Sequence, residues 1–397
     1  MKKHYKVIIV GGGTAGITVG ARLLRKRKAL HGDVAIIDPA DHHAYQPLWT
    51  LAGAGVVEKE RTRRDMGSVI PDGADWIKKS AAFFDPENHR LTTTDHHTFT
   101  YDYLVAAPGI HIHWEHVKGL PETLGKNSVC SIYSYEHVDD TWNTIRNFKG
   151  GNAIFTHPNT PIKCGGAPQK IMYLAEEAFG RAGIRDRTNV IFESANPAIF
   201  DVPKYRAALE KVLERKSIQA CFRRHLVKVD GERKKAVFED LETGSMITRP
   251  FEMLHVCPPM AAPDFIQHSL LADEAGWIDV HPRTLQHNRF ANVFGLGDAS
   301  NLPTSKTGAA IRKQAPVVVE NLMALMDGRP LRAQYDGYTS CPVVTGYNKV
   351  VLAEFDYDKR PRETMPFNQA VERRSMYFLK KNLLPIMYWK GMLKGKM

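Results

Sequence analysis

Three features of the sequence predict an α/β protein that contains two Rossmann-like dinucleotide-binding domains. An apolar run, a glycine-rich loop and an amphipathic helix follow one another in residues 5–38. A second strand, loop and helix pattern begins near Asn152, and a late strand at 290–300 ends in Gly-x-Gly-Asp. Strands that alternate with helices are typical of parallel sheets covered by their own crossover helices. We expect the late strand to return to the first sheet.

The first unit is the most informative stretch of the chain. Residues 5–10 are apolar and rich in β-branched side chains, which predicts a buried parallel strand. The next six residues, 11–16, match G-x-G-x-x-G. A helix is expected from Ile17 to about Leu30, and a second strand, 34–37, leads directly into Asp38.

Each part of this unit has a role in binding a dinucleotide. Gly11 allows the tight turn, Gly13 lets the backbone approach a pyrophosphate, and Gly16 allows the helix to pack closely on the strand. The helix N-terminus offers free N–H groups and a positive dipole end to phosphates. Asp38 can accept hydrogen bonds from a ribose. The pattern favours a dinucleotide but does not distinguish FAD from NAD.

Further strands of the first domain are expected at 76–84, 90–94 and 101–109, the last of which closes with a Pro-Gly turn. Asp298, at the end of the late strand, can hydrogen-bond a ribityl or phosphate group. A helix that opens at 306–310 and runs to about Leu325 would direct its N–H groups to the same sheet edge.

The second unit departs from the first at its loop. A strand at 152–156, a helix at 170–181 and a strand at 189–193 have the spacing of a nucleotide-binding half. However, Cys164-Gly165-Gly166 stand where the phosphate loop would be. We therefore expect this unit not to bind NAD(P)H.

Composition limits the function classes. The 397 residues carry a net charge of +11, which favours an anionic partner, but no long basic block or nucleic-acid motif is present. We expect anionic lipid or small anions, and no nucleic acid. Five cysteines without C-x-x-C spacing argue against a disulfide framework or a zinc motif. His111, His113 and His116 are interpreted as an exposed loop, so no metal is expected.

The last stretch, 373–397, differs from the rest. It has seven basic residues and no acidic one, interleaved with aromatic and aliphatic side chains. Pro385 is expected to divide it into two short helices. Short amphipathic pieces of this composition suit the plane of a membrane interface. The alternative is a helical pair that packs on the protein's own core.

Four stretches together resemble the sulfide:quinone oxidoreductases, in the branch that includes the mitochondrial enzyme. They are His43–Gly55 (HAYQPLWTLAGAG), Pro158–Tyr173 (PNTPIKCGGAPQKIMY), Asn292–Thr307 (NVFGLGDASNLPTSKT) and Tyr335–Tyr357 (YDGYTSCPVVTGYNKVVLAEFDY). The resemblance covers nearly the whole chain. The second and fourth stretches are the most specific, because each carries a redox cysteine of the family.

The resemblance implies a disulfide-reductase-like flavoprotein with one noncovalent FAD. Hydrogen sulfide would be oxidised at the pair Cys164 and Cys341, with two electrons passed through FAD to a membrane quinone. The sulfane sulfur would go to sulfite, glutathione, coenzyme A or a growing polysulfide. By position, the residues expected to contact FAD are Gly11, Gly13, Thr14, Ala15, Gly16, Asp38, Gln46, Ala81, Asp298, Gly308, Ala309 and Ala310.

Three further residues match family positions with auxiliary roles. Lys170 and Lys380 correspond to positions tied to the active centre or the quinone pocket, and Glu122 to an acid that relays protons. The residues taken alone favour ordinary surface charges at all three positions. Cys130, Cys221 and Cys257 are interpreted as structural.

The expected organisation has four parts. Residues 1–115 form the first part of the FAD-binding domain, 116–284 the second Rossmann-like domain, 285–340 the return to the FAD-binding domain, and 341–397 a quinone and membrane-interface region. The chain is expected to be a peripheral membrane protein, and a homo-oligomer is compatible with the sequence. The expected membrane is the bacterial cytoplasmic membrane, or the mitochondrial inner membrane if this is a mature eukaryotic form.

Two other functions compete with this interpretation. An NADH:quinone reductase-like flavoenzyme would need a second phosphate loop near residues 155–168, where the cysteine loop stands instead. A nonenzymatic FAD-binding, membrane-associated protein would bind the flavin without reacting with sulfide. Anaerobic addition of sulfide, followed by the flavin spectrum, discriminates among the three.

Overall fold

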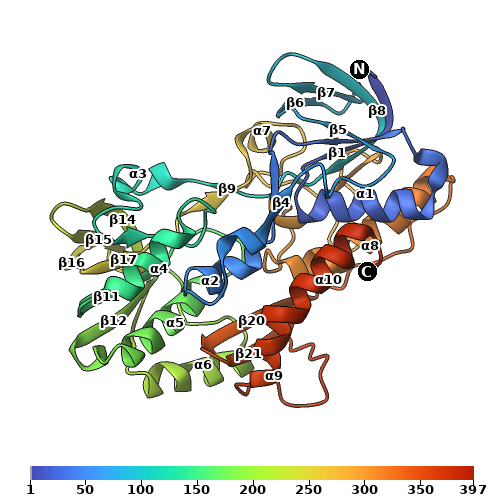
Figure 1. The fold of residues 1–397 in the computed structure, drawn as a ribbon. Coiled ribbons are helices and arrows are strands. Elements are labelled where there is room, and N and C mark those ends of the chain that lie inside the picture. The colour runs from blue at the N-terminus through green and yellow to red at the C-terminus, as the bar shows by residue number, and fades with distance from the viewer. Residues whose placement is uncertain (1) are drawn as a thin grey trace.

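A computed structural model describes residues 2–397. The first sheet has seven strands in the order β5-β2-β1-β8-β7-β6, with β19 paired to β8 (Figure 1). Its strands are β1 (His4–Val10), β2 (Val34–Ile37), β5 (Ala74–Ile77), β6 (Ala81–Asp85), β7 (Arg90–Thr93), β8 (Thr98–Ala106) and β19 (Val293–Gly295).

The centre of this sheet is parallel and buried on both faces. Strand β1 pairs in parallel with β2 and β8, with Val10 opposite Ile37 on one side and Ala106 on the other. Helices α1 (Thr14–Lys26) and α8 (Gly308–Met326) pack against each other beside the sheet. The expected late strand is β19, which runs parallel to β8 with Gly295 opposite Ala106. The chain therefore returns to its first sheet after about half its length.

A second, five-stranded parallel sheet has the order β10-β17-β11-β12-β13. Its strands are β10 (Val129–Cys130), β11 (Gly151–His157), β12 (Thr188–Ser194), β13 (Gln219–Phe222) and β17 (Met253–His255). Four helices accompany this sheet: α3 (Leu120–Thr123), α4 (Val138–Asn147), α5 (Ala167–Arg181) and α6 (Pro203–Arg215). Three antiparallel strands complete this part: β14 (Arg224–Asp230), β15 (Lys235–Asp240) and β16 (Met246–Pro250).

Two small ribbons position the elements that matter for the site. Strand β9 (His111–Ile112) pairs antiparallel with β18 (Met260–Ala261), where the chain crosses between the two sheets. Strands β20 (Thr339–Gly346) and β21 (Lys349–Phe355) form a hairpin that packs on α5. The connecting segments contain four short elements: β3 (His42–Ala44), β4 (Arg63–Asp65), α2 (Trp49–Ala52) and α7 (Asp264–Gln267).

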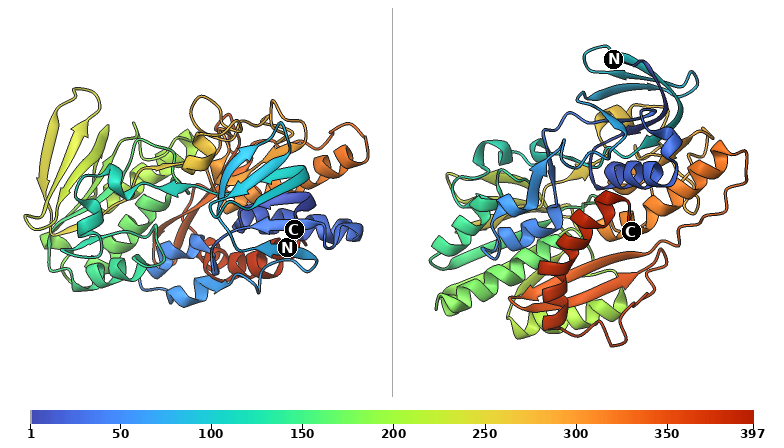
Figure 2. Two further views of the ribbon diagram at one scale, coloured as in Figure 1. Left: turned by 90° about the horizontal axis from the view of Figure 1, so that it is seen from above. Right: turned by 45° about the vertical axis from the view of Figure 1, so that its right-hand side comes forward.

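The C-terminal stretch forms one helical run beside α1, as Figure 2 shows in its right-hand view. The run consists of α9 (Arg374–Phe378), a π-helical segment (Leu379–Leu383) and α10 (Leu384–Lys390). Its inner face, which includes Tyr388 and Trp389, is buried in the core, whereas Phe378, Leu383 and Ile386 are exposed. Within residues 2–397, no helix has the length and apolar character needed to cross a membrane.

The structure corrects several expected elements. The single strand expected at 76–84 is two strands, β5 and β6, because β5 pairs with β2 while β6 lies at the other end of the sheet beside β7. Helix α1 ends at Lys26 and is followed by a separate turn, Lys28–Leu30. Pro385 does not separate two helices, since it lies in the first turn of α10, where its missing N–H costs little, directly after the π-helical segment.

The histidines near residue 113 do not form a fully exposed loop. His111 belongs to β9, and the His113 side chain is buried with only 8% of its surface exposed. The interpretation as an exposed loop was therefore wrong for His113, because the pairing of β9 with β18 draws this segment onto the protein.

Candidate active site

The fold brings two cysteines together that are 177 residues apart in the sequence. The sulfurs of Cys164 and Cys341 lie 3.8 Å apart. Cys164 is in the loop just before α5, and Cys341 is on β20, which packs against α5. Cys341 is buried and Cys164 is partly exposed.

The backbone of Cys164 is held in an uncommon conformation. Its φ is 56°, in the left-handed region that non-glycine residues rarely adopt. Its N–H donates to the carbonyl of Lys306 at 2.8 Å, and its carbonyl accepts from Ala167 at 2.7 Å. Strain of this kind persists only where the surroundings impose it, and it is concentrated at functional sites.

Gly166 makes room for the sulfur of Cys341. A Cβ at this position would stand 2.5 Å from Cys341 Sγ, well inside van der Waals contact. Gly166 also precedes α5, and its carbonyl accepts the Lys170 N–H in the first turn of that helix. The cysteine loop therefore needs a glycine here to let the two sulfurs approach.

A buried ammonium group faces the pair. Lys170 Nζ donates to Cys164 Sγ at 3.1 Å, and Lys170 is 2% exposed. The hydrogen bond from Cys341, together with the positive charges of Lys170 and Lys380, holds the pKa of Cys164 well below its usual range. The hydrogen bond to Cys164 and burial raise the pKa of Cys341 well above its usual range. The surroundings of the pair thus favour the thiolate form of Cys164 and the thiol form of Cys341.

Lys380 comes to the same region from the C-terminal run. Its Nζ donates to the carbonyl of Pro47 at 3.0 Å, and the side chain is 4% exposed. Burial and the nearby charge of Lys170 lower the pKa of Lys380 to about 7. This lysine can therefore change its charge near neutral pH.

The interpretation of Lys170 and Lys380 as ordinary surface charges was wrong. Both are buried, because α5 and the π-helical segment turn these faces toward the cysteines. The family resemblance tied both lysines to the active centre or the quinone pocket, but the residues around them gave no sign of burial. Glu122, by contrast, is exposed on α3 in the second part of the molecule, and it is not among the groups that shift the pKa of either cysteine.

The glycine-rich loop has the close contacts expected of a dinucleotide-binding turn. A Cβ at Gly11 would stand 2.2 Å from the carbonyl oxygen of Ala107, and one at Gly16 would stand 1.9 Å from that of Gly11. At Gly13 it would meet nothing within 4 Å, so the backbone there is open to a ligand. Asp38 accepts from the Gly12 N–H at 2.6 Å. These features fit a bound dinucleotide.

The remaining residues expected at FAD lie on five separate elements. Thr14 and Ala15 open α1, and Gly308, Ala309 and Ala310 open α8, where Thr307 caps the helix by accepting from the Ala310 N–H. Burial raises the pKa of Asp298, and burial lowers the pKa of its neighbours Lys163 and Lys306 to about 8 each. Gln46 is exposed at the start of a short turn, and Ala81 is buried at the start of β6.

Sequence reasoning missed a polar group that joins the loop to the C-terminal run. The Tyr388 hydroxyl is 2.8 Å from Thr14 Oγ1 and also bonds His43 Nε2, while His43 Nδ1 lies 2.8 Å from the carbonyl of Gly12. Both rings are buried. A histidine within the uncharged stretch 43–55 was the available signal, because such a residue is usually buried with a partner.

The other cysteines differ in their surroundings. Cys130 and Cys257 are fully buried and Cys221 is partly exposed, and burial raises the pKa of all three. They are therefore protonated thiols at neutral pH. Cys257 nevertheless lies close enough to Cys164 and Lys163 for their charges to affect it.

The fold and the loop place the chain in a broad class of proteins. Residues 5–144 match the family model described as pyridine nucleotide-disulphide oxidoreductase. A solved structure of the sulfide:quinone oxidoreductase from the hyperthermophilic bacterium Aquifex aeolicus superposes with a TM-score of 0.85 at 19% identity, over 100% of this chain and 92% of that chain. The fold is thus the two-domain α/β fold of disulfide-reductase-like proteins.

Sequence comparison gives relatives of higher identity than this solved structure. The mitochondrial sulfide:quinone oxidoreductase of Mus musculus is 46% identical over 396 residues, which cover 99% of this chain and 87% of the relative. The corresponding protein of Dictyostelium discoideum is 45% identical, over 100% of this chain and 87% of the relative. The chain belongs to the sulfide:quinone oxidoreductase family and is an enzyme of that family.

Proposed function

We propose that this enzyme oxidises hydrogen sulfide at Cys164 and Cys341 and delivers two electrons through FAD to a membrane quinone. One observation carries the proposal: two sulfurs 177 residues apart lie 3.8 Å from each other, with a buried ammonium 3.1 Å from one of them. The similar mitochondrial proteins are named for the same substrates.

The sulfur chemistry follows from the asymmetry of the pair. When the two cysteines are joined, hydrosulfide attacks the sulfur of Cys341, the Cys164–Cys341 bond breaks, and Cys164 leaves as a thiolate. Cys341 then carries the substrate sulfur as a persulfide. Cys164 is the better leaving group, because the positive charge of Lys170 stabilises its thiolate.

A small acceptor completes the cycle. Sulfite, glutathione, coenzyme A or a polysulfide takes the outer sulfur from Cys341, which is left as a thiolate. Formation of the Cys164–Cys341 bond from the two reduced sulfurs then releases two electrons. FAD, when bound, supplies a two-electron acceptor between this centre and the quinone.

The residues that would hold FAD are those of the glycine-rich loop, Asp38, Asp298 and the start of α8. Gly13 and Gly308 leave their backbones open, since a Cβ at either position would meet nothing within 4 Å. The N-termini of α1 and α8 direct free N–H groups and positive dipole ends to anionic groups. The division into an FAD-binding domain (1–115 and 285–340), a cysteine-bearing domain (116–284) and an interface region (341–397) is part of this proposal.

Lys170 and Lys380 would act on the charge of the sulfur centre. Hydrosulfide, the thiolate and the persulfide are all anions, and a buried positive charge stabilises each of them. Glu122 is exposed and has no such contact, so it carries no part of the proposed chemistry.

The test uses the flavin-loaded protein under anaerobic conditions. Sulfide should bleach the flavin and quinone should restore it, whereas NADH should do neither. Cys164→Ser and Cys341→Ser should each lower sulfide-dependent quinone reduction by at least about 10³-fold while the flavin stays bound. Cys221→Ser, a partly exposed cysteine away from the pair, is the matched control. Turnover retained in both site variants would overturn the mechanism.

Membrane contact is the other part of the proposal. Phe378, Leu383 and Ile386 are 57%, 42% and 52% exposed on the C-terminal helical run, beside Lys381 and Lys390. An apolar face with flanking lysines suits the interface of an anionic membrane, where a quinone is available. The protein would be peripheral to the bacterial cytoplasmic membrane or the mitochondrial inner membrane.

Vesicle binding tests this surface. Ile386→Glu should weaken binding to anionic vesicles by at least about tenfold, since one apolar side chain contributes about 1.5–3 kcal/mol. Phe83→Glu, at a residue that is 59% exposed on β6, is the control and should have no effect. Equal binding by wild type and Ile386→Glu would exclude this face as the membrane contact.

A further inference from the structure

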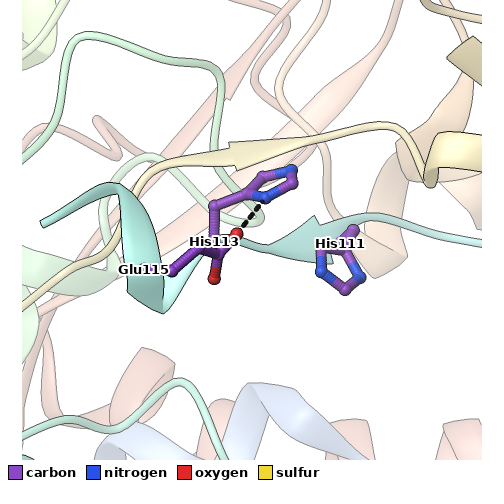
Figure 3. Close-up of side chains that lie close together, drawn as sticks. All are labelled: His111, His113 and Glu115. Carbon is purple, nitrogen blue, oxygen red and sulfur yellow. Dashed lines mark hydrogen bonds and ion pairs between the residues drawn. The ribbon is translucent and has the colours of Figure 1, made fainter. Parts of the chain in front are cut away.

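A cluster of metal-ligating side chains lies outside the site described above. His111, His113 and Glu115 each offer one donor atom, and the three atoms all lie within 4.8 Å of one another (Figure 3). The two imidazole rings have centroids 4.7 Å apart. Nothing in the proposed sulfide chemistry uses these residues.

We propose that His111, His113 and Glu115 bind one divalent transition-metal ion of the zinc type. Two imidazole nitrogens and a carboxylate oxygen form a donor set that zinc accepts, and imidazole nitrogen also suits copper and nickel. Hard ions such as Mg²⁺ prefer an all-oxygen set, which this cluster does not offer. With neutral imidazoles the ligands carry a net charge of −1, which favours a divalent cation.

The distances fit an ion after a small adjustment. Zinc–nitrogen and zinc–oxygen bonds of about 2.0–2.2 Å place two ligand atoms of a tetrahedral ion roughly 3.5 Å apart. His113 Nδ1 and Glu115 Oε1 are already 2.7 Å apart, and they share a proton whose place the ion would take. His111 and Glu115 are exposed, so rotation of their side chains can close the remaining gap.

His113 anchors the site. The residue is buried, and its backbone N–H donates to the carbonyl of Pro259 at 2.9 Å, next to the strand β18 that pairs with β9. A donor that is already fixed reduces the conformational entropy lost when an ion binds. Because β9 and β18 are where the chain crosses between the two sheets, the ion would fasten the crossing strand to the turn that follows it.

The cluster leaves coordination positions open. His116 stacks on His113 with the rings 8° from parallel and 4.3 Å apart, so its nitrogens cannot point to the same ion while the stack persists. His116 Nε2 is 3.9 Å from Glu115 Oε1. The site therefore supplies three protein ligands, and water or an added anion would complete the set.

Zinc titration of the flavin-loaded, untagged full chain tests the proposal. Calorimetry should show one zinc ion per chain at this site, and Mg²⁺ should not compete. His111→Ala and Glu115→Gln, both at exposed positions, should each weaken binding by at least about 10–100-fold, as even the loss of an outer-shell partner does. Both variants should keep sulfide-dependent bleaching of the flavin, which shows that they are folded.

The matched control is the exposed pair His97 and Asp95, whose atoms lie 3.3 Å apart on the first domain. The double variant His97→Ala with Asp95→Asn should bind zinc as the wild type does. X-ray absorption of the zinc-loaded protein should show nitrogen and oxygen neighbours only. Zinc–sulfur distances of about 2.3 Å would place the ion at the cysteines and overturn the proposal. Equal zinc affinity in the wild type, His111→Ala and Glu115→Gln would also overturn it.

Discussion

Two strand–loop–helix units of this molecule share one architecture, but the loops between strand and helix carry different residues. In the first, β1 leads through a glycine-rich loop into α1, and in the second, β11 leads through the cysteine loop into α5. The first loop is shaped by glycines that let backbone atoms approach one another. The second keeps a glycine where a sulfur approaches, and it holds Cys164 at a φ of 56°. One scaffold thus presents an open glycine backbone in one place and a cysteine that faces a second sulfur in the other.

The largest effect is expected from filling the first loop. In Gly16→Ala, the new Cβ would stand 1.9 Å from the backbone oxygen of Gly11, which cannot move away without shifting β1. We expect the free energy of unfolding to fall by about 1–3 kcal/mol or more, together with loss of the flavin. Denaturant unfolding and the flavin absorbance of the purified protein measure both.

Gly13→Ala is the matched control for that variant. Its Cβ would meet no atom within 4 Å, so stability should be retained while flavin binding weakens through the lost backbone approach. If Gly13→Ala binds the flavin as tightly as wild type, the first loop is a structural turn and the contrast between the two loops disappears.

The second loop can be filled in the same way. In Gly166→Ala, the Cβ would stand 2.5 Å from Cys341 Sγ and would displace that sulfur from its position beside Cys164. We expect flavin content to stay normal and sulfide-dependent turnover to fall about 100-fold, the usual cost of displacing a reacting group by about 1 Å. Gly165→Ala, where a Cβ has no neighbour within 4 Å, should retain activity. An equal loss in both variants would argue against a specific role for Gly166.

A smaller change removes the charge beside the sulfur and leaves the loop intact. In Lys170→Met, Cys164 loses its partner at 3.1 Å, so its pKa should rise toward the usual value of a thiol. In the wild type, the lowered pKa favours the thiolate form of Cys164. In the variant, the thiolate fraction should fall as the pH decreases through the neutral range.

Alkylation of Cys164 in the reduced protein, followed by peptide mass at pH 5–9, measures this shift. Lys170→Arg should restore most of the wild-type profile because it keeps the positive charge. An unchanged profile in Lys170→Met would mean that Cys341 and Lys380 determine the charge of Cys164 without Lys170.

The sequence predicted the fold through its local patterns. The run 5–16 predicted β1 and its loop, because an apolar strand, a fixed glycine spacing and a helix start are all read within a few residues. The return of residues 293–295 to the first sheet followed from a strand pattern late in the chain. Position-by-position resemblance also selected Cys164 and Cys341, whose sulfurs the fold brings to 3.8 Å.

What the sequence could not predict depends on packing between distant segments. Lys170 and Lys380 look like surface lysines until α5, β20 and the C-terminal run are packed together, and only then does their burial become visible. Gly166 looks like an ordinary helix-start glycine, because the atom that requires it belongs to residue 341. The partners of His43 and Tyr388 are likewise set by a contact across most of the chain.

The bond between Thr14 and Tyr388 joins residues 374 positions apart, and Gly395 lies directly against Ala21 on α1. During translation, the opening helix leaves the ribosome long before the segment that covers it has been made. That flank of the newborn domain stays exposed to water until residues 388–395 have been made. Loss of residues 388–395 would therefore leave an early-folding element permanently uncovered, a defect that cellular quality control is well placed to detect.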